Sequence, residues 1–141
     1  MSGITPPSAS TLRAYRLSRY SAGDIVTYIG ARPKGPRQDQ GRMTLVLLGA
    51  CNPCGRRRPD GWNARMMERL RLVLRRVRFI EASGSLGPWS ESMLAAPISP
   101  RKAVVVARRF RQNAVVVIST NRRTKLVLLQ TSIFLYDGIR C

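Results

Sequence analysis

Two cysteines, Cys51 and Cys54, stand at a spacing that lets a pair of thiols do chemistry. Two thiolates separated by two residues can share a zinc ion or cycle as a redox pair. A structural zinc takes four ligands, and because the chain has no histidine, only Cys141 is left as a further sulfur ligand. A redox pair usually opens a helix, whereas this one leads into a loop that contains Pro59. We therefore interpret the pair as incidental, and we expect neither a metal site nor a cofactor.

A run of three arginines, from Arg56 to Arg58, follows directly. Guanidinium groups bind phosphate oxygens through paired hydrogen bonds, so such a run on a Gly/Pro loop is suited to hold a phosphate backbone. Further arginines extend the pattern along the next expected helix and at the end of the one after it. They are Arg65, Arg69, Arg75, Arg76, Arg108 and Arg109. The alternative is a solvated loop and helix face without a ligand.

A second candidate site consists of polar and aromatic residues at what we expect to be one end of a sheet. They are Asn52, Trp89, Glu91, Gln112 and Asn113. Glu91 closely follows Trp89, and an acid beside an indole is desolvated, which raises its pKa. Gln112 and Asn113 join an expected helix to an expected strand, where such side chains commonly bond open backbone groups. The alternatives are a small-molecule or enzymatic site and a set of structural caps and surface ion pairs.

The absence of histidine excludes several classes of enzyme. Ser-His-Asp catalysis, Cys-His catalysis and imidazole metal sites all need that side chain. The glycine-rich loops that cradle phosphates, GxxxxGK(S/T) and GxGxxG, do not occur in the chain. No pair of carboxylates at catalytic spacing can be identified. We therefore assign no catalytic residue and favour a protein that is not an enzyme.

Net charge gives the strongest indication of a partner. Lys and Arg number 25 against 7 Asp and Glu, a formal charge of +18, and the only lysines are Lys34, Lys102 and Lys125. A GC-rich genome favours arginine codons and so explains arginine over lysine, but it does not explain the scarcity of acids. Such a charge attracts polyanions and causes self-repulsion in the folded state. It favours RNA, DNA or an acidic protein as the partner, and it names no reaction.

Length and composition fit one folded domain. The chain has 141 residues, a mass of 15.8 kDa and 44% hydrophobic residues, which is enough to bury a core. The first ten residues lack the pattern of a signal peptide, and apolar runs such as 114–118 are too short to cross a bilayer. Three cysteines do not suggest a disulfide scaffold. We expect a bacterial, cytoplasmic protein with reduced thiols and no membrane contact.

Capping signals and periodicity predict three helices. The first runs from a cap at Ser10 to about Tyr20. The second spans about 63–77, where apolar residues at helical spacing form one stripe opposite an arc of arginines. The stripe consists of Met66, Met67, Leu70, Val73, Leu74 and Val77. The third begins at Ser99, which is followed by a proline, and continues to about Arg111.

Alternating or uniformly apolar runs predict the strands. They span residues 24–29, 43–48, 78–82, 93–98, 114–119 and 124–130. Segments 30–41 and 83–90 are rich in Gly, Pro and polar residues and are predicted to be loops. The predicted fold class is α/β, with α+β as the alternative: a single small domain with a mixed sheet of about five or six strands, covered by two or three helices. We expect a flexible leader over 1–10, the domain over 11–130 and a C-terminal tail over 131–141.

Four short segments carry a resemblance to a known family. They are Ala14-Tyr15-Arg16 with Arg19-Tyr20, Asn52-Pro53, Trp89 with Glu91, and Ala107-Arg108-Arg109-Phe110 with Gln112-Asn113-Ala114. Together, over roughly residues 12–130, they resemble domain of unknown function 3293, an uncharacterised bacterial family. The resemblance implies a small stand-alone α/β domain and brings no established activity. It also implies an aromatic residue at the position of Cys51 and a less basic chain. The thiol and the high positive charge are therefore particular to this sequence.

These observations lead to three hypotheses of function. The first is a non-enzymatic domain that binds RNA or DNA backbone with little sequence preference, through Arg56, Arg57, Arg58, Arg65, Arg69, Arg75 and Arg76, and with a steep salt dependence. The second is a ligand-binding or enzymatic site around Asn52 and Glu91. The third is a module whose basic face docks on an acidic protein. We favour the first.

Overall fold

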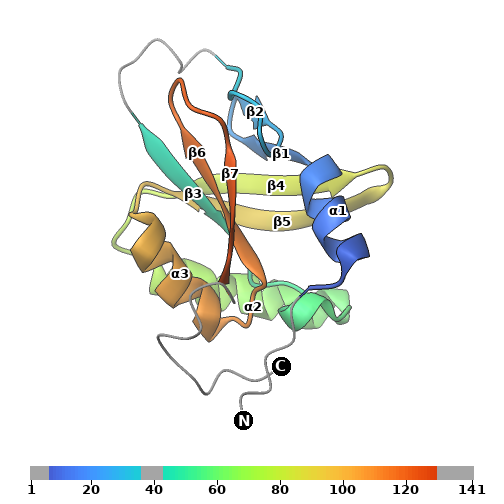
Figure 1. Ribbon diagram of the computed structural model, residues 1–141. Helices are drawn as coiled ribbons and strands as arrows, with labels where there is room; N and C mark the ends of the chain where they lie inside the picture. The colour runs from blue at the N-terminus through green and yellow to red at the C-terminus, as the bar shows by residue number, and fades with distance from the viewer. Residues whose placement is uncertain (1–6, 36–42, 130–141) are drawn as a thin grey trace.

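Seven strands form one sheet in the computed structural model, which describes residues 7–35 and 43–129 (Figure 1). In chain order they are β1 (Arg19–Ala22), β2 (Ile25–Thr27), β3 (Thr44–Leu48), β4 (Ile80–Leu86), β5 (Trp89–Ala96), β6 (Ala114–Ser119) and β7 (Lys125–Leu128). Their order across the sheet is β2-β1-β4-β5-β3-β6-β7. The α/β class is confirmed. The sheet has more strands than expected, and instead of being mixed it pairs antiparallel throughout the described residues.

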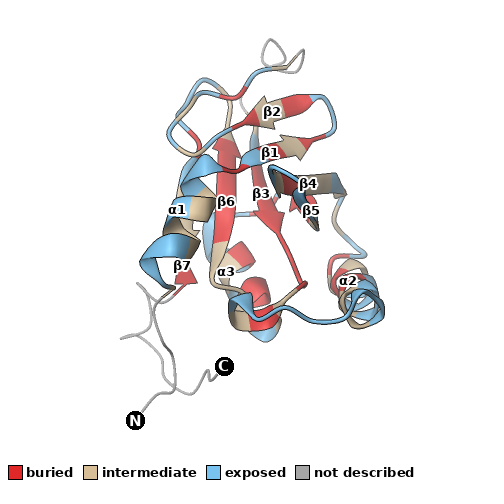
Figure 2. Cartoon of the chain, turned by 90° about the vertical axis from the view of Figure 1, so that its right-hand side faces the viewer, coloured by how far each residue is buried: buried red, intermediate tan, exposed pale blue. Residues whose placement is uncertain are grey.

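Side chains alternate between the two faces of the central strands, and each face has its own apolar core. Within the described residues, the helices are α1 (Ala9–Leu17), α2 (Asp60–Val73), α3 (Pro100–Arg109) and the short 3-10 helix η2 (Pro53–Gly55). Val46 and Leu48 of β3 face the core that α2 and α3 cover. Leu45 and Leu47 face the other core, which the β1–β2 hairpin covers because the sheet curls. Buried residues accordingly dominate β3 and β6 (Figure 2).

The second helix confirms the predicted amphipathic pattern with shifted ends. α2 begins directly after Pro59 and ends at Val73, earlier than expected. Of the predicted stripe, Met67, Leu70 and Leu74 are buried. The remaining members of the stripe are partly buried against the same core; they are Met66, Val73 and Val77. The apolar stripe therefore fixes α2 on the sheet and leaves the arginine arc outside.

The third helix and the last hairpin are where the sequence predicts them. Ser99 Oγ accepts the backbone N–H of Lys102 at 3.1 Å, and Pro100 occupies the first turn of α3. The helix ends before Arg111, whose φ of 53° is left-handed and stops helical propagation. β6 and β7 form the expected hairpin, with Asn121 at φ 60° in its turn. The helix cap and the turn residue both act locally, which is why sequence reasoning finds these elements.

The first helix differs from its prediction at both ends. Ser8 caps α1 instead of Ser10: Ser8 Oγ accepts the backbone N–H of Thr11 at 3.1 Å. The helix ends at Leu17, and β1 replaces its expected last turn. The reason is tertiary, because β1 pairs with β2 on one side and β4 on the other, which outweighs weak helix propensity. Tyr20 thereby becomes a buried residue of the second core.

The predicted loop over 83–90 is wrong. β4 and β5 form one long hairpin in which Leu86 pairs with Trp89 across a two-residue turn. The small residues that suggested a loop are sites of close packing instead. A Cβ on Gly84 would lie 3.1 Å from Tyr20 Cε1, because Tyr20 and Gly84 pair across β1 and β4. The glycine is therefore present because the tyrosine ring lies over it.

This packing predicts the effect of Gly84→Val. The added methyls meet the Tyr20 ring, so we expect the free energy of unfolding to fall by about 1–3 kcal/mol in urea titrations. The neighbouring Ser85→Val points to the opposite face and serves as the control, with an expected change within about 0.5 kcal/mol. Equal stability of the two variants would contradict the packing of Tyr20 on Gly84.

Helix length bears on membrane association. In the part of the chain that is described, no helix has the length and apolar character needed to cross a bilayer.

Candidate functional site

The predicted arginines gather on and around α2, in what we call the α2 basic surface. Its members are Arg56, Arg57, Arg58, Arg65, Arg69, Arg75 and Arg76, and all of them are exposed. They lie on the loop before α2, on its outer face and just after its end. One face of α2 packs on the sheet, and Figure 2 shows exposed residues on the ribbon of this helix.

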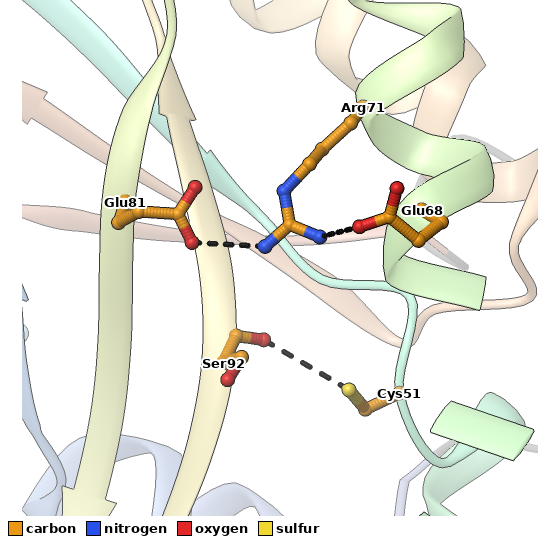
Figure 3. A network of polar contacts seen from close by, with 5 residues as sticks. All are labelled: Cys51, Glu68, Arg71, Glu81 and Ser92. Atoms are coloured by element: carbon orange, nitrogen blue, oxygen red, sulfur yellow. Dashed lines mark hydrogen bonds and ion pairs between the residues drawn. The ribbon is translucent and has the colours of Figure 1, made fainter. Parts of the chain in front are cut away.

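Arg71, in contrast, is held by acids of the protein itself (Figure 3). Its guanidinium donates to Glu68 Oε1 at 2.7 Å and to Glu81 Oε1 at 2.9 Å, which ties α2 to β4. Bonding to Glu81, and then the charges of both carboxylates, raise the pKa of Arg71. Within residues 7–35 and 43–129, no member of the α2 basic surface forms such an ion pair. All seven of these side chains are exposed.

The other predicted arginines, Arg108 and Arg109, lie on the last turn of α3. Arg108 is half-buried and Arg109 is exposed. They belong to the same helical layer as α2 but to a different helix, and we do not include them in the α2 basic surface. On that surface, the Arg58 guanidinium lies 5.4 Å from the ring centre of Trp62, a cation–π contact that holds one end of the arginine run.

The second candidate site centres on Asn52, just after β3. Its backbone is left-handed, with φ 48°, and its N–H donates to Asn63 Oδ1 at 3.0 Å. Asn52 Oδ1 accepts the Asn63 side-chain amide at 2.9 Å and the Arg58 backbone N–H at 2.9 Å. Hydrogen bonding from the Asn52 side chain also lowers the pKa of Glu91 on β5. One asparagine thus connects the arginine loop and α2.

Glu91 is half-buried on β5, opposite Gly84 and on the same face as Tyr20. Burial raises the pKa of Glu91 to about 7, and the bond from Asn52 offsets part of that rise. The direction of this shift agrees with the expectation from the sequence, and its first cause in the structure is burial. A carboxyl group with this pKa exchanges its proton near neutrality, as a general acid or base must.

Two tyrosines complete the surroundings of Glu91. Asn113 Nδ2 donates to the Tyr15 hydroxyl oxygen at 3.1 Å, and the Tyr20 hydroxyl donates to the Tyr15 carbonyl at 3.0 Å. Burial raises the pKa of both phenols, that of Tyr20 to about 12, and the negative charge of Glu91 adds to both shifts. We call Tyr15, Asn52, Glu91 and Asn113 the Glu91 cluster. Its members come from α1, the loop after β3, β5 and the loop before β6.

The remaining two residues predicted for this site, Gln112 and Trp89, are not members of the Glu91 cluster. Gln112 Nε2 donates to the carbonyls of Cys51 at 3.0 Å and Phe110 at 3.1 Å, so its role is to bind two loops together. The Cys54 backbone N–H reinforces the same junction at 2.7 Å from the Arg111 carbonyl. Trp89 stands at the end of the β4–β5 hairpin with 45% of its surface exposed, and it is not part of the Glu91 cluster.

The two cysteines are not partners of each other. Cys51 is a free, buried thiol whose Sγ points at the Ser92 carbonyl 4.0 Å away (Figure 3). Burial, with the charge of Glu91, raises the pKa of the Cys51 thiol to about 11, so it stays protonated and unreactive at neutral pH. Cys54 is disulfide-bonded, which corrects the expectation of reduced thiols. Among the described residues, no group of His, Cys, Asp and Glu is placed to hold a metal ion.

Sequence reasoning missed Tyr15, Tyr20 and Asn63 as members of the polar network. The two tyrosines do belong to one of the segments that carry the family resemblance, which was the available signal. Asn63 had no comparable signal, because its role depends on the position of Asn52 across a turn.

Comparisons with known proteins agree with that resemblance. Residues 48–115 match the family described as a protein of unknown function, DUF3293. This stretch holds Asn52, Glu91 and Asn113, together with the whole of the α2 basic surface. No curated protein and no solved structure matches the chain. The resemblance is therefore confirmed, and the family description assigns no activity.

Proposed function

We propose that this protein binds the phosphate backbone of RNA or DNA through the α2 basic surface, with little sequence preference. The observation that carries the proposal is the contrast between Arg71, which two carboxylates hold, and the seven arginines around it, which have no ion pair among the described residues. Arginine is suited to this task because its planar group binds phosphate oxygens through paired hydrogen bonds.

The local charge balance supports the proposal. From Arg56 to Arg76 the acids are Asp60 and Glu68, and Glu68 is already paired with Arg71. Exposed like charges on one helix repel each other and lower the stability of the folded protein. An anionic partner would reduce this repulsion. Aromatic residues make up only 6% of the chain, which favours backbone contacts over base stacking.

Binding of fluorescent random-sequence RNA and duplex DNA, measured by anisotropy over a salt series, tests the proposal. We expect log K to fall linearly with log salt, with a slope of about −0.7 to −0.9 for each phosphate neutralised. We also expect little difference between sequences, because phosphate contacts carry no base information. Undetectable binding to both nucleic acids at low salt would contradict the proposal.

A further inference from the structure

We propose that Arg58 and Trp62 together form a stacking position for one unpaired base, which gives the α2 basic surface a preference for single-stranded RNA or DNA. The inference rests on the proposed function and deepens it. Phosphate contacts still carry most of the affinity, and the stacked base adds the preference for single strands. Arg58 lies on the loop before α2, and Trp62 lies in the first turn of that helix.

The first support is the geometry of this pair. The Arg58 guanidinium lies over the Trp62 ring, 5.4 Å from its centre, which is within the range of a cation–π contact. Arg58 is exposed and Trp62 is half-buried, so the guanidinium lies on the solvent side of the pair. A guanidinium is planar, and the bases of single strands stack on such planes as well as on aromatic rings. A base on the outer side of Arg58 therefore extends the pair to three layers.

The second support is that both backbone groups of Arg58 are held in place. The Arg58 N–H donates to Asn52 Oδ1 at 2.9 Å, and the Arg58 carbonyl accepts the Asn63 side-chain amide at 3.3 Å. The same amide donates to Asn52 Oδ1 at 2.9 Å, and Asn63 Oδ1 accepts the Asn52 backbone N–H at 3.0 Å. Groups that are fixed before binding lose less conformational entropy when the ligand binds. This network therefore keeps Arg58 next to Trp62 in the unbound protein.

The third support is the position of the neighbouring arginines. Arg65 and Arg69 follow Trp62 on α2 at i+3 and i+7, so the three side chains lie on one side of the helix. Both arginines are exposed, and within the described residues neither forms an ion pair. A strand whose phosphates contact Arg65 and Arg69 therefore reaches the stacking position at the start of α2.

These features favour a single strand over a duplex. Bases in a duplex are stacked on one another, whereas the bases of a single strand can be unstacked and offer their faces to a protein. Stacking also tolerates sequence, because every base has a π-face. One stacking position is therefore compatible with little sequence preference.

The test compares two oligomers that carry the same number of phosphates, by anisotropy on the whole protein. One is a short labelled oligothymidylate, and the other has the same length with every base replaced by an abasic site. We expect the oligothymidylate to bind about fivefold to a hundredfold more tightly, because only it offers a base for stacking. The salt slopes of the two oligomers should agree, since the phosphate contacts are the same.

Variants then locate the stacked base. Arg58→Lys keeps the charge but removes the planar group, and Trp62→Leu removes the ring beneath it. Each is expected to reduce the affinity for oligothymidylate toward that for the abasic oligomer and to change the abasic affinity by no more than about twofold. Arg57→Lys and Trp89→Leu make the same kinds of exchange at exposed residues outside the pair. We expect both controls to keep the full difference between the oligomers.

The outcomes separate this inference from the proposed function. Absence of binding to both oligomers would contradict the proposed function and, with it, the stacking position. Equal binding of the two oligomers would leave the proposed function intact and overturn the stacking position, and so would a full difference retained in Arg58→Lys. Loss of the difference in Trp89→Leu would place the stacked base at the β4–β5 hairpin instead. Because Arg58 is exposed and its bonds to the loop are made by its backbone, Arg58→Lys keeps the test decisive even if Trp62→Leu fails to fold.

Discussion

Replacing Glu91 by glutamine is expected to stabilise the folded protein by about 3 kcal/mol above pH 7 and to have little effect near pH 4. Burial raises the pKa of Glu91 from an ordinary 4.5 to about 7. Between these values the folded protein keeps a proton that the unfolded chain has released. The contribution of Glu91 to the free energy of unfolding therefore falls as pH rises from about 4.5 to about 7 and is constant beyond. Glutamine cannot ionise and escapes this loss.

Urea unfolding of both proteins across this pH range measures the effect. The quantity of interest is the difference in unfolding free energy between wild type and Glu91→Gln, because the general rise in positive charge at acid pH acts on both. Glu81→Gln is the control: its carboxylate is exposed and paired with Arg71, so we expect no growing advantage with pH. A difference that does not change with pH would contradict the burial of Glu91.

This expected gain in stability bears on the role of Glu91. If a simple amide stabilises the fold at neutral pH, then the carboxylate is not present for stability. Residues that lower stability in this way are typical of sites where chemistry or binding requires them. The pH series therefore measures what the carboxylate costs the fold.

Sequence patterns predicted those elements of the fold that local signals determine. The Ser99 cap with its proline, the apolar stripe of α2, and the β6–β7 hairpin each depend on neighbours in the chain. β1 and the β4–β5 hairpin depend instead on pairing between distant segments, such as Ser21 with Ser83, whose hydroxyl groups lie 2.8 Å apart. From the sequence alone, their Gly and Ser residues suggest a loop. In the structure the ring of Tyr20 packs over Gly84, and this distant contact explains the glycine in the strand.

The candidate site was predictable to a similar extent. Asn52, Glu91 and Asn113 were predicted to lie together, which stays a prediction; in the structure Asn113 donates to Tyr15, and Asn52 bonds Asn63 and the Arg58 backbone. Trp89 was grouped with Glu91 by proximity in the chain, but the hairpin turn carries it outward. Tyr15 could not be placed from the sequence, because its bond to Asn113 joins residues 98 positions apart.

The largest effect on nucleic-acid binding is expected from a variant that removes five arginines of the α2 basic surface. It replaces Arg56, Arg57, Arg58, Arg65 and Arg69 by glutamine. We expect affinity for random RNA at low salt to fall about a hundredfold or more, and the salt slope to become less steep by about three to five units. Anisotropy over the salt series measures both. Stability should change little, since relief of repulsion along one helix offsets the lost contact of Arg58 with Trp62.

A matched variant separates the placement of charge from its amount. It replaces five exposed arginines elsewhere, Arg13, Arg16, Arg32, Arg101 and Arg122, by glutamine. Both variants carry the same net charge, so long-range attraction to a polyanion falls equally in the two. Only direct phosphate contacts distinguish them, and we expect the matched variant to keep most of its affinity and nearly all of its salt slope. Equal losses would assign binding to the total charge of the chain and contradict a defined surface on α2.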